Sequence, residues 1–358
     1  MILDFAQIHK DDILRAGGKG ANLGEMTAAG INVPKGFVIT AEAYREFLKE
    51  NKIDEIISRT LVEKQTDEQA LLSAAGEFRK KIIAGHFPAQ LEKEIREKYA
   101  ELGESARVAV RSSATAEDLP DASFAGQQET YLNVQGIEDV LIYICHCYAS
   151  LWGDRAVSYR FNQGYNQNTV AIAVVIQEMV ESEKAGVLFT LNPVTQNKDE
   201  IQINASYGLG ESVVSGRVTA DNYIVNKSGD IIEINIGSKK TQIIYGDKNT
   251  KEEAVSEAKR IQSALDDTEI AGLVKAGLKI EKHYGMPMDI EWAIQNNQIY
   301  IMQARAITTL KNNDDEERIQ AYIKHSKLTK MMEENKINGN FSAKNGIGVY
   351  VSKIYDAG

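Results

Sequence analysis

Residues 289–305, Asp-Ile-Glu-Trp-Ala-Ile-Gln-Asn-Asn-Gln-Ile-Tyr-Ile-Met-Gln-Ala-Arg, constrain the fold more than any other stretch of the sequence. Apolar and polar residues alternate on both sides of a short polar segment around Asn297, which is typical of two β-strands joined in a hairpin. Pairing centred on Asn297 places Glu291 opposite Gln303 and Asp289 opposite Arg305. It also gathers carbon-rich side chains on one face, namely Ile290, Trp292, Ile294, Tyr300, Met302 and Ala304.

The register of this hairpin follows from the burial of one face. A two-residue Asn-Asn turn would shift the pairing by one residue and mix the faces, so we predict an odd-numbered loop. The polar face would then carry Asp289, Glu291, Ala293, Ile301, Gln303 and Arg305. Carboxylate and amide oxygens beside a guanidinium can hold Mg²⁺ and a polyphosphate. A surface hairpin with an Asp–Arg cross-strand pair is the alternative.

Length and composition describe a globular protein with more than one domain. The chain has 358 residues, of which 43% are hydrophobic and 26% are charged, and this is enough for two or three domains. A net charge of −10 and a pI of about 5.2 argue against nucleic acid or an anionic membrane as the partner. An acidic chain that binds an anion must gather its cations locally, so single Lys and Arg residues in glycine-rich settings become candidates.

The first residues and the cysteines favour the cytoplasm. Residues 1–12 lack the basic and apolar segments of a secretory signal, and the apolar run 170–176 is too short to span a membrane. Cys145 and Cys147 stand two positions apart in a predicted helix, where they point in different directions and pack as small apolar residues. We therefore expect a cytoplasmic protein without disulfides.

A glycine-rich segment over residues 14–30 is predicted to form a loop that runs into a short helix. Gly17, Gly18 and Gly20 would let the backbone approach a ligand closely, and Lys19 supplies a positive charge for a phosphate. The spacing differs from that of a P-loop. A plain loop before a helix is the alternative interpretation.

The segment over residues 107–134 is the most informative run. A predicted strand over 108–111 delivers Arg111 into a long stretch of small and hydroxyl-bearing residues, and a second strand follows at 130–134. Hydroxyls, backbone N–H groups and a strand-end arginine are what phosphate oxygens require. An ordinary hairpin loop is the alternative, although loops of this length usually have a function.

Periodicity and turn signals predict the remaining elements. Helices are expected over residues 41–50 (capped by Thr40), 51–104 with a break near 85–88, 136–165 and 251–284. Strands are expected just before Thr40 and over residues 170–179, 186–190, 201–205, 223–226 and 231–236. A second glycine-rich turn, residues 208–216, is expected to open a helix.

Several of these segments resemble the ATP-binding domain of phosphoenolpyruvate synthase, which pyruvate phosphate dikinase and rifampicin phosphotransferase share. The most specific are Val110-Arg-Ser-Ser-Ala-Thr-Ala-Glu-Asp-Leu-Pro120 and Ser123-Phe-Ala-Gly-Gln-Gln-Glu-Thr130. The other matching blocks are residues 17–24, 174–179, 186–195, 206–216, 289–292 and 303–305. So many blocks in the family's order make a chance match very improbable.

The resemblance implies an α+β fold of the ATP-grasp type, with two lobes of mainly antiparallel sheet around a nucleotide cleft. The N-terminal lobe would cover residues 1–185, with a helical insert over about 41–104, and the C-terminal lobe residues 186–310. Residues 311–337 would form a charged linker and helix, and residues 338–358 the start of a following domain.

The resemblance also implies the ATP-binding residues of the first lobe. Lys19 and Arg111 would bind the phosphates and act as catalytic residues. Gly126 and Thr130 would belong to the loop over the phosphates. Gln177 would face the adenine. ATP is therefore an expected cofactor.

In the second lobe, the resemblance implies that Glu291 and Gln303 hold Mg²⁺, the other expected cofactor. Arg305 would meet the β- or γ-phosphate as a third catalytic residue. The sequence departs from the family pattern at two positions nearby. Ala306 stands where the family usually has Pro, and Asn192 replaces a common Asp.

In the family, ATP phosphorylates a histidine on a separate swivelling domain, AMP and phosphate are released, and the histidine passes the phosphoryl group to pyruvate or another acceptor. None of the five histidines here lies in the family's glycine-rich phosphohistidine setting. The resemblance thus implies a phosphotransferase for the nucleotide half-reaction, with a phosphohistidine domain in cis or on another chain as partner. An ATP domain of a rifampicin phosphotransferase and a nucleotide-binding module without turnover are the alternatives.

Overall fold

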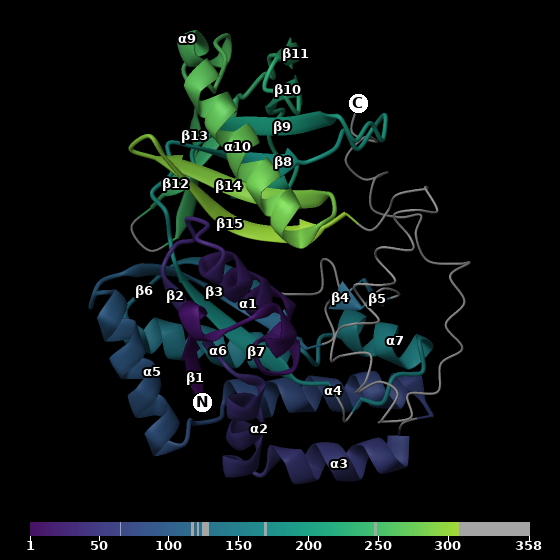
Figure 1. The fold of residues 1–358 in the computed structure, drawn as a ribbon. Helices are drawn as coiled ribbons and strands as arrows, with labels where there is room; N and C mark the ends of the chain where they lie inside the picture. Colours follow the sequence, from purple (N-terminus) through teal and green to yellow (C-terminus); the bar gives the residue numbers. More distant parts are fainter. Residues whose placement is uncertain are drawn as a thin grey trace. The chain divides into compact units, whose positions relative to one another are not determined.

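The computed structural model describes residues 1–64, 66–115, 129–167, 170–246 and 249–307, with the backbone of Asp118–Leu119 and Ala122–Ser123. Helices and strands form two compact units, each described here by itself (Figure 1). The first unit comprises Met1–Glu25 and Lys35–Met179, and the second comprises Met26–Pro34 and the described residues from Val180 onward. The boundary expected at residue 185 lies inside a strand of the second unit. The segments predicted over 311–337 and 338–358 lie outside the described residues.

The first unit is built on a five-stranded antiparallel sheet with the strand order β1-β2-β7-β3-β6. Its strands are β1 (Ile2–Asp4), β2 (Gly36–Ile39), β7 (Ile172–Glu178), β3 (Arg107–Ala114) and β6 (Thr130–Gln135). The middle strand, β7, is buried from Ile172 to Gln177. Both faces of this strand are covered, which explains why its sequence is almost continuously apolar.

Helices cover one face of this sheet (Figure 1). Helices α2 (Ala41–Glu50), α5 (Ala89–Leu102) and α6 (Ile137–Ser150) pack on its strands, and α3 (Ile53–Lys64), α4 (Glu68–Ile83) and α7 (Asp154–Asn162) form an outer layer. Val108 and Val110 of β3 pack with Val174 and Ile176 of β7 in the core beneath these helices. Side chains alternate along a strand, so the residues between these valines face the other side.

Most of the helices of the first unit confirm their predicted positions. Helix α2 begins directly after Thr40, but the Thr40 hydroxyl makes no capping hydrogen bond within the described residues. The predicted break near residues 85–88 separates α4 from α5. The helix predicted over 136–165 is instead two helices, α6 and α7, because the chain leaves the helix at residues 151–153.

The segment over residues 14–30 does not form the predicted loop. Helix α1 (Ile13–Ala28) occupies most of it, with a kink at Gly17, where φ is 68° and ψ is 173°. Helix α1 packs on the sheet face opposite the helical core, since a Cβ on Gly20 would lie 3.1 Å from Val38. The glycines suggested a loop in the sequence, but two of them serve close packing of the helix on the protein itself.

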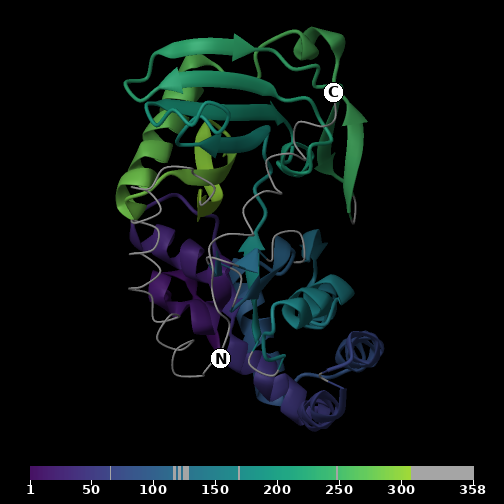
Figure 2. The ribbon, with the colours of Figure 1, turned by 90° about the vertical axis from the view of Figure 1, so that its right-hand side faces the viewer.

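The second unit is built on a six-stranded antiparallel sheet with the strand order β11-β10-β9-β8-β14-β15. Its strands are β8 (Lys184–Phe189), β9 (Glu200–Tyr207), β10 (Asp221–Asn226), β11 (Ile231–Asn235), β14 (Met288–Gln295) and β15 (Gln298–Ala306). Helix α10 (Asp267–Tyr284) crosses one face of the sheet (Figure 2), and a Cβ on its Gly277 would lie 2.8 Å from Leu188. The antiparallel sheets with their covering helices confirm the predicted α+β class.

The first part of the helix predicted over residues 251–284 is wrong. Strands β12 (Thr241–Tyr245) and β13 (Thr250–Ala254) pair in a separate two-stranded sheet, and the short helix α9 (Glu257–Arg260) precedes α10. Residues 251–254 favour a helix individually, but this weak preference yields to pairing with β12. The remaining short elements are α8 (Glu211–Val214), which follows the second glycine-rich turn as predicted, η1 (Phe5–Gln7), η2 (Lys10–Asp12), β4 (Asp118–Leu119) and β5 (Ala122–Ser123).

The hairpin of β14 and β15 confirms the predicted pairs Asp289–Arg305 and Glu291–Gln303, but the predicted odd-numbered loop is wrong. The turn has two residues, Asn296 and Asn297, with positive φ values of 50° and 60° as in a type I′ turn. A bulge after Glu291 absorbs the extra residue of β15.

The bulge exchanges side chains between the two faces of the hairpin. Trp292 pairs with Ile301, and both are buried. Tyr300 and Met302, predicted on the apolar face with Trp292, instead pack against a small cluster that contains Ala293. The strand pairing thus has one register before the bulge and another after it. The bulge allows both the burial of Trp292 and the preferred two-residue turn.

Candidate functional site

The sheet of the first unit carries a polar face on the side of α1. Because Val108 and Val110 point into the helical core, Arg111 and Ser113 of β3 point to the opposite face. Gln177 of β7 lies on this same face, since it pairs with Ala109 two positions before Arg111. Thr130, the first residue of β6, is the direct cross-strand partner of Arg111. Three neighbouring strands thus bring three of the predicted site residues together.

Arg111 is held in place by the neighbouring strand. Its side chain is only 8% exposed, and Nη1 donates a hydrogen bond of 3.2 Å to Oε1 of the fully buried Gln177. The Nε2 atom of Gln177 donates no hydrogen bond within the described part of the chain. A buried amide donor without an acceptor is costly, so a ligand acceptor at this point would be stabilising.

Lys19 lies on α1, two residues beyond the kink, and is half-buried. Its charge reaches helix α6, where burial and the Glu129 carboxylate raise the pKa of the Cys147 thiol and Lys19 lowers it. Burial also raises the pKa of Cys145, to about 12, and both cysteines are buried free thiols, as their predicted packing role requires. Gly126, the remaining predicted residue of this unit, lies outside the described residues.

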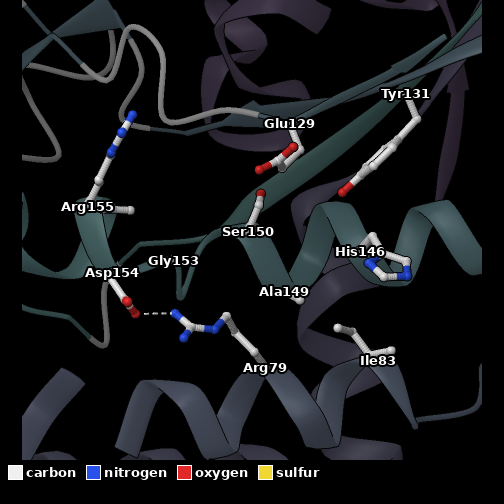
Figure 3. A pocket seen from close by; sticks show the side chains of 11 residues that line it. Arg79, Ile83, Glu129, Tyr131, His146, Ala149, Ser150, Gly153, Asp154 and Arg155 are labelled. Carbon is white, nitrogen blue, oxygen red and sulfur yellow. Dashed lines mark hydrogen bonds and ion pairs between the residues drawn. The ribbon is translucent and has the colours of Figure 1, made fainter. Parts of the chain in front are cut away.

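A surface hollow of about 410 Å³ opens beside the edge strand β6, among α4, α6 and the start of α7 (Figure 3). At one end Arg79 pairs with Asp154 at 2.5 Å, and at the other the rings of Tyr131 and His146 lie 5.9 Å apart. Charges of both signs line it without converging on one point (Figure 3). Lys19, Arg111 and Gln177 do not line it, so the candidate site is not in this hollow.

In the second unit, the polar face of the hairpin lies opposite the face covered by α10. Ile290 pairs with Leu188 under that helix, so Asp289 and Glu291 point to the other side. Asp289 and Arg305 form an ion pair in which Nε and Nη2 of the arginine lie 2.8 and 2.7 Å from the same oxygen, Oδ2. Arg305 keeps 54% of its side chain exposed, whereas Asp289 keeps 13%.

The surroundings of Asp289 act on its pKa in opposite directions. Burial raises the pKa of Asp289, Arg305 lowers it, and the negative charge of Glu291 raises it again. Glu291 and Gln303 are both half-buried and directly paired across the strands. Asp289 lies on the same strand face as Glu291 and beside its pair with Gln303, and the sequence interpretation treated Asp289 only as the partner of Arg305. Its position on this strand face was the available signal for adding it to the candidate residues.

This donor set suits a hard cation. Mg²⁺ takes oxygen ligands and is usually held by one or two carboxylates together with phosphate oxygens. The described ranges contain no group of three or more His, Cys, Asp and Glu side chains that could hold a metal alone. Two carboxylates and one amide oxygen therefore fit an ion that arrives with a phosphate, and its charge would relieve the repulsion between Asp289 and Glu291.

Asn192, where the family commonly has Asp, has a structural role. Its Oδ1 accepts hydrogen bonds from the backbone N–H groups of Val194 and Thr195, at 3.0 and 3.2 Å. Its Nδ2 donates to Glu200 at 2.7 Å. The amide thus closes an Asx turn and also satisfies a carboxylate, which a second aspartate could not do.

Comparison with known proteins identifies relatives over most of the chain. The family model of the pyruvate phosphate dikinase AMP/ATP-binding domain matches residues 13–326. A probable phosphoenolpyruvate synthase of Methanocaldococcus jannaschii is 48% identical over 323 residues, which cover 87% of this chain and 27% of the relative. The phosphoenolpyruvate synthase of Pyrococcus furiosus is 43% identical, with 86% of this chain and 44% of the relative covered.

A rifampicin phosphotransferase of Bacillus cereus is 41% identical over 335 residues, which cover 91% of this chain and 38% of that protein. This chain thus spans less than half the length of each of these three relatives. Two crystal structures of D-alanine–D-alanine ligase from Bacillus anthracis match with TM-scores of 0.23 and 0.24 at 10% and 12% identity. They cover 61% and 68% of this chain and 54% and 65% of the ligase chains, and scores this low do not bear on the fold. Among the described residues, no helix has the length and apolar character needed to cross a membrane.

Proposed function

The chain belongs to the family of the pyruvate phosphate dikinase AMP/ATP-binding domain, and from this membership we propose that it binds Mg-ATP and donates a phosphoryl group. The observation that carries the proposal is the polar face of the first sheet, where a buried arginine and an unsatisfied amide donor stand together. A buried cation held by the protein is suited to a polyphosphate, because the cost of ordering it is met before the ligand arrives.

In this proposal Lys19 and Arg111 bind the phosphates of ATP. Thr130 lies directly beside Arg111 on the neighbouring strand and offers a hydroxyl, and Gly126 belongs to the segment that follows β3. Gln177 keeps Arg111 in place through Oε1, and its free Nε2 faces an acceptor on the nucleotide, which we assign to the adenine.

Glu291, Gln303 and Asp289 would hold Mg²⁺, and Arg305 would bind the β- or γ-phosphate. When bound, the ion supplies charge neutralisation for the phosphoryl group in transfer. Arg305 is exposed enough to turn towards a phosphate, and its present partner Asp289 would then be offset by the ion. The two units would thus contribute separate ligand sets, in the manner of an ATP-grasp enzyme.

The reaction that we propose is the nucleotide half of a phosphoenolpyruvate synthase-like dikinase, carried out in the cytoplasm. ATP would phosphorylate a histidine on a swivelling domain, in cis or on another chain, with release of AMP and phosphate. The support is the identity of 48% and 43% to phosphoenolpyruvate synthases that are much longer than this chain. A role as ATP domain of a rifampicin phosphotransferase is the second candidate, favoured by the 41% identity over 91% of the chain.

A transfer assay tests this proposal. The chain is mixed with Mg²⁺, ATP labelled in the β-phosphoryl group and a separately produced phosphohistidine domain of a phosphoenolpyruvate synthase. Label on the histidine supports the dikinase half-reaction, and the same assay with the domain of a rifampicin phosphotransferase compares the two candidates. Tight Mg-ATP binding without transfer to either domain would instead indicate a nucleotide-binding module without turnover.

A further inference from the structure

A buried hydroxyl joins the kink of helix α1 to the sheet. Ser113 of β3 is fully buried, and its Oγ donates a hydrogen bond of 2.9 Å to the carbonyl oxygen of Ala16. The same Oγ accepts a hydrogen bond of 3.2 Å from the backbone N–H of Gly20. An unbroken α-helix would join this N–H and this carbonyl directly, because they stand four residues apart. The Ser113 hydroxyl therefore bridges the helix at the point where it bends.

Gly17 makes this close approach possible. Its φ of 68° with ψ of 173° is a conformation that residues with a Cβ rarely adopt. A Cβ at this position would also lie 2.2 Å from both the carbonyl oxygen and the Oγ of Ser113. The glycine thus lets the helix backbone touch the strand, and the serine fixes the angle at which the helix continues.

Lys19 lies between the two groups that Ser113 bridges. The direction in which Lys19 leaves the backbone depends on how the helix resumes after Gly17. We propose that Ser113 is a positioning residue, which orients Lys19 towards the phosphates of ATP through this bridge without touching the nucleotide. The inference rests on the proposed phosphate-binding role of Lys19.

Two residues of β3 have different roles in this proposal, since Arg111 binds the phosphates and Ser113 positions Lys19. Arg111 and Ser113 are neighbours on one face of β3, and both are buried. Arg111 is hydrogen-bonded to Gln177 of the sheet, whereas the hydroxyl of Ser113 is hydrogen-bonded to α1. One strand would thus fix both phosphate-binding cations, Arg111 through its own side chain and Lys19 through a helix that it anchors.

A double-mutant cycle on ATP affinity tests the inference. We expect Lys19→Met to weaken ATP binding roughly 30-fold and Ser113→Ala roughly tenfold, since each removes interactions to charged or buried groups. If Ser113 acts through Lys19, the double variant binds no more weakly than Lys19→Met alone. Multiplication of the two losses, or a Ser113→Ala affinity within twofold of the wild type, would overturn the inference while leaving the proposed function intact. An unchanged affinity in Lys19→Met would count against both.

Thr115→Val is the matched control. Thr115 also bears a buried hydroxyl near the end of the same strand, and it also makes two hydrogen bonds, to the carbonyl oxygen and the N–H of Ala171 at 3.0 and 3.3 Å. Ala171 directly precedes β7 and does not belong to α1, so we expect a lower melting temperature with ATP affinity within twofold. A loss of affinity equal to that of Ser113→Ala would show a general effect of destabilisation and overturn the positioning role.

Amide hydrogen exchange on the wild-type chain tests the bridge without any substitution. The N–H of Gly20 is predicted to be protected like the amides of the second half of α1, because Ser113 accepts its hydrogen bond. Exchange at the rate of an exposed amide would contradict the bridge, even if the Ser113→Ala variant failed to fold.

Discussion

Arg111 of the first unit and Arg305 of the second are both proposed phosphate ligands, yet the protein holds them in different ways. Arg111 is 8% exposed in the interior of a sheet, and one of its hydrogen bonds goes to the neutral amide of Gln177. Arg305 keeps 54% of its side chain exposed near the end of an edge strand, with the carboxylate of Asp289 as its partner. Burial in the sheet therefore holds Arg111 in one position, whereas the exposed Arg305 can change its partner.

This difference suggests separate roles for the two units in ATP binding. The first unit offers a fixed cation whose ordering cost has been met in folding. The second unit gathers two carboxylates on one strand face, where burial and then the charge of Glu291 raise the pKa of Asp289 against the opposing effect of Arg305, so a further cation would be stabilising there. We therefore expect the affinity for the phosphates to depend on the first unit and the dependence on Mg²⁺ to depend on the second.

Gly17→Ala is expected to have the largest effect, because it disrupts the kink by which helix α1 packs on the sheet of the first unit. The positive φ and the 2.2 Å approach of the new Cβ to Ser113 should together cost about 4 kcal/mol of folding free energy. Urea unfolding measures this, with Gly76→Ala in the middle of α4 as control, where a Cβ meets nothing closer than 3.7 Å. Equal midpoints for the two variants would show that the kink is not constrained.

Arg111→Met should weaken ATP binding by about 2.8 kcal/mol, roughly 100-fold, because it removes a buried cation while keeping its volume. Isothermal titration calorimetry with Mg-ATP measures the loss. Arg107→Met on the same strand is the control, since Arg107 is hydrogen-bonded to Asn133 and lies outside the proposed site. Similar ATP affinities of the two variants would contradict the proposal that Arg111 binds the phosphates.

Glu291→Gln should weaken Mg-ATP binding by about 2 kcal/mol, roughly 30-fold, since it removes one of the carboxylates that the ion needs. Binding of ATP without Mg²⁺ should be unchanged, and the concentration of Mg²⁺ that gives half-maximal ATP binding should rise. Glu233→Gln, on strand β11 of the same sheet, is the control. An unaltered Mg²⁺ requirement in Glu291→Gln would show that the metal is held elsewhere.

Asn297→Gly should have the smallest effect, a stabilisation of about 0.5 kcal/mol, because Asn-Gly is the preferred pair of a type I′ turn. Both turn residues have positive φ, and the turn fixes the register that brings Glu291 opposite Gln303. Thermal unfolding measures the change. Destabilisation would show that the hairpin does not depend on this turn type.

The parts of the fold that could be predicted depend on local pattern. The pairs Asp289–Arg305 and Glu291–Gln303 follow from strict alternation, and helix α2 follows from its period and the preceding Thr40. The predicted odd-numbered loop was wrong because its prediction considered only the burial of whole strand faces. A two-residue turn with a bulge satisfies both the turn preference and the burial, and a sequence pattern does not distinguish these solutions.

Other features depend on contacts between distant parts of the chain, which no local pattern reports. The hydrogen bond between Arg111 and Gln177 joins residues 66 positions apart, and that between Ser113 and Ala16 joins residues 97 apart. The fully buried pair of Lys239 and Asp221 is another example, since charged residues are expected at the surface. Buried polar groups form such contacts in place of hydrogen bonds to water. Their partners cannot be identified from the sequence until the packing is known.

ATP titration of the wild-type chain, once with Mg²⁺ and once with a chelator, is the most direct test of the division between a fixed cation and an ion-dependent carboxylate pair. The account predicts measurable ATP binding in the chelator, supported by Arg111 and Lys19, and binding at least about tenfold tighter when Mg²⁺ is present. Equal affinity under the two conditions, or no binding under either, would contradict it.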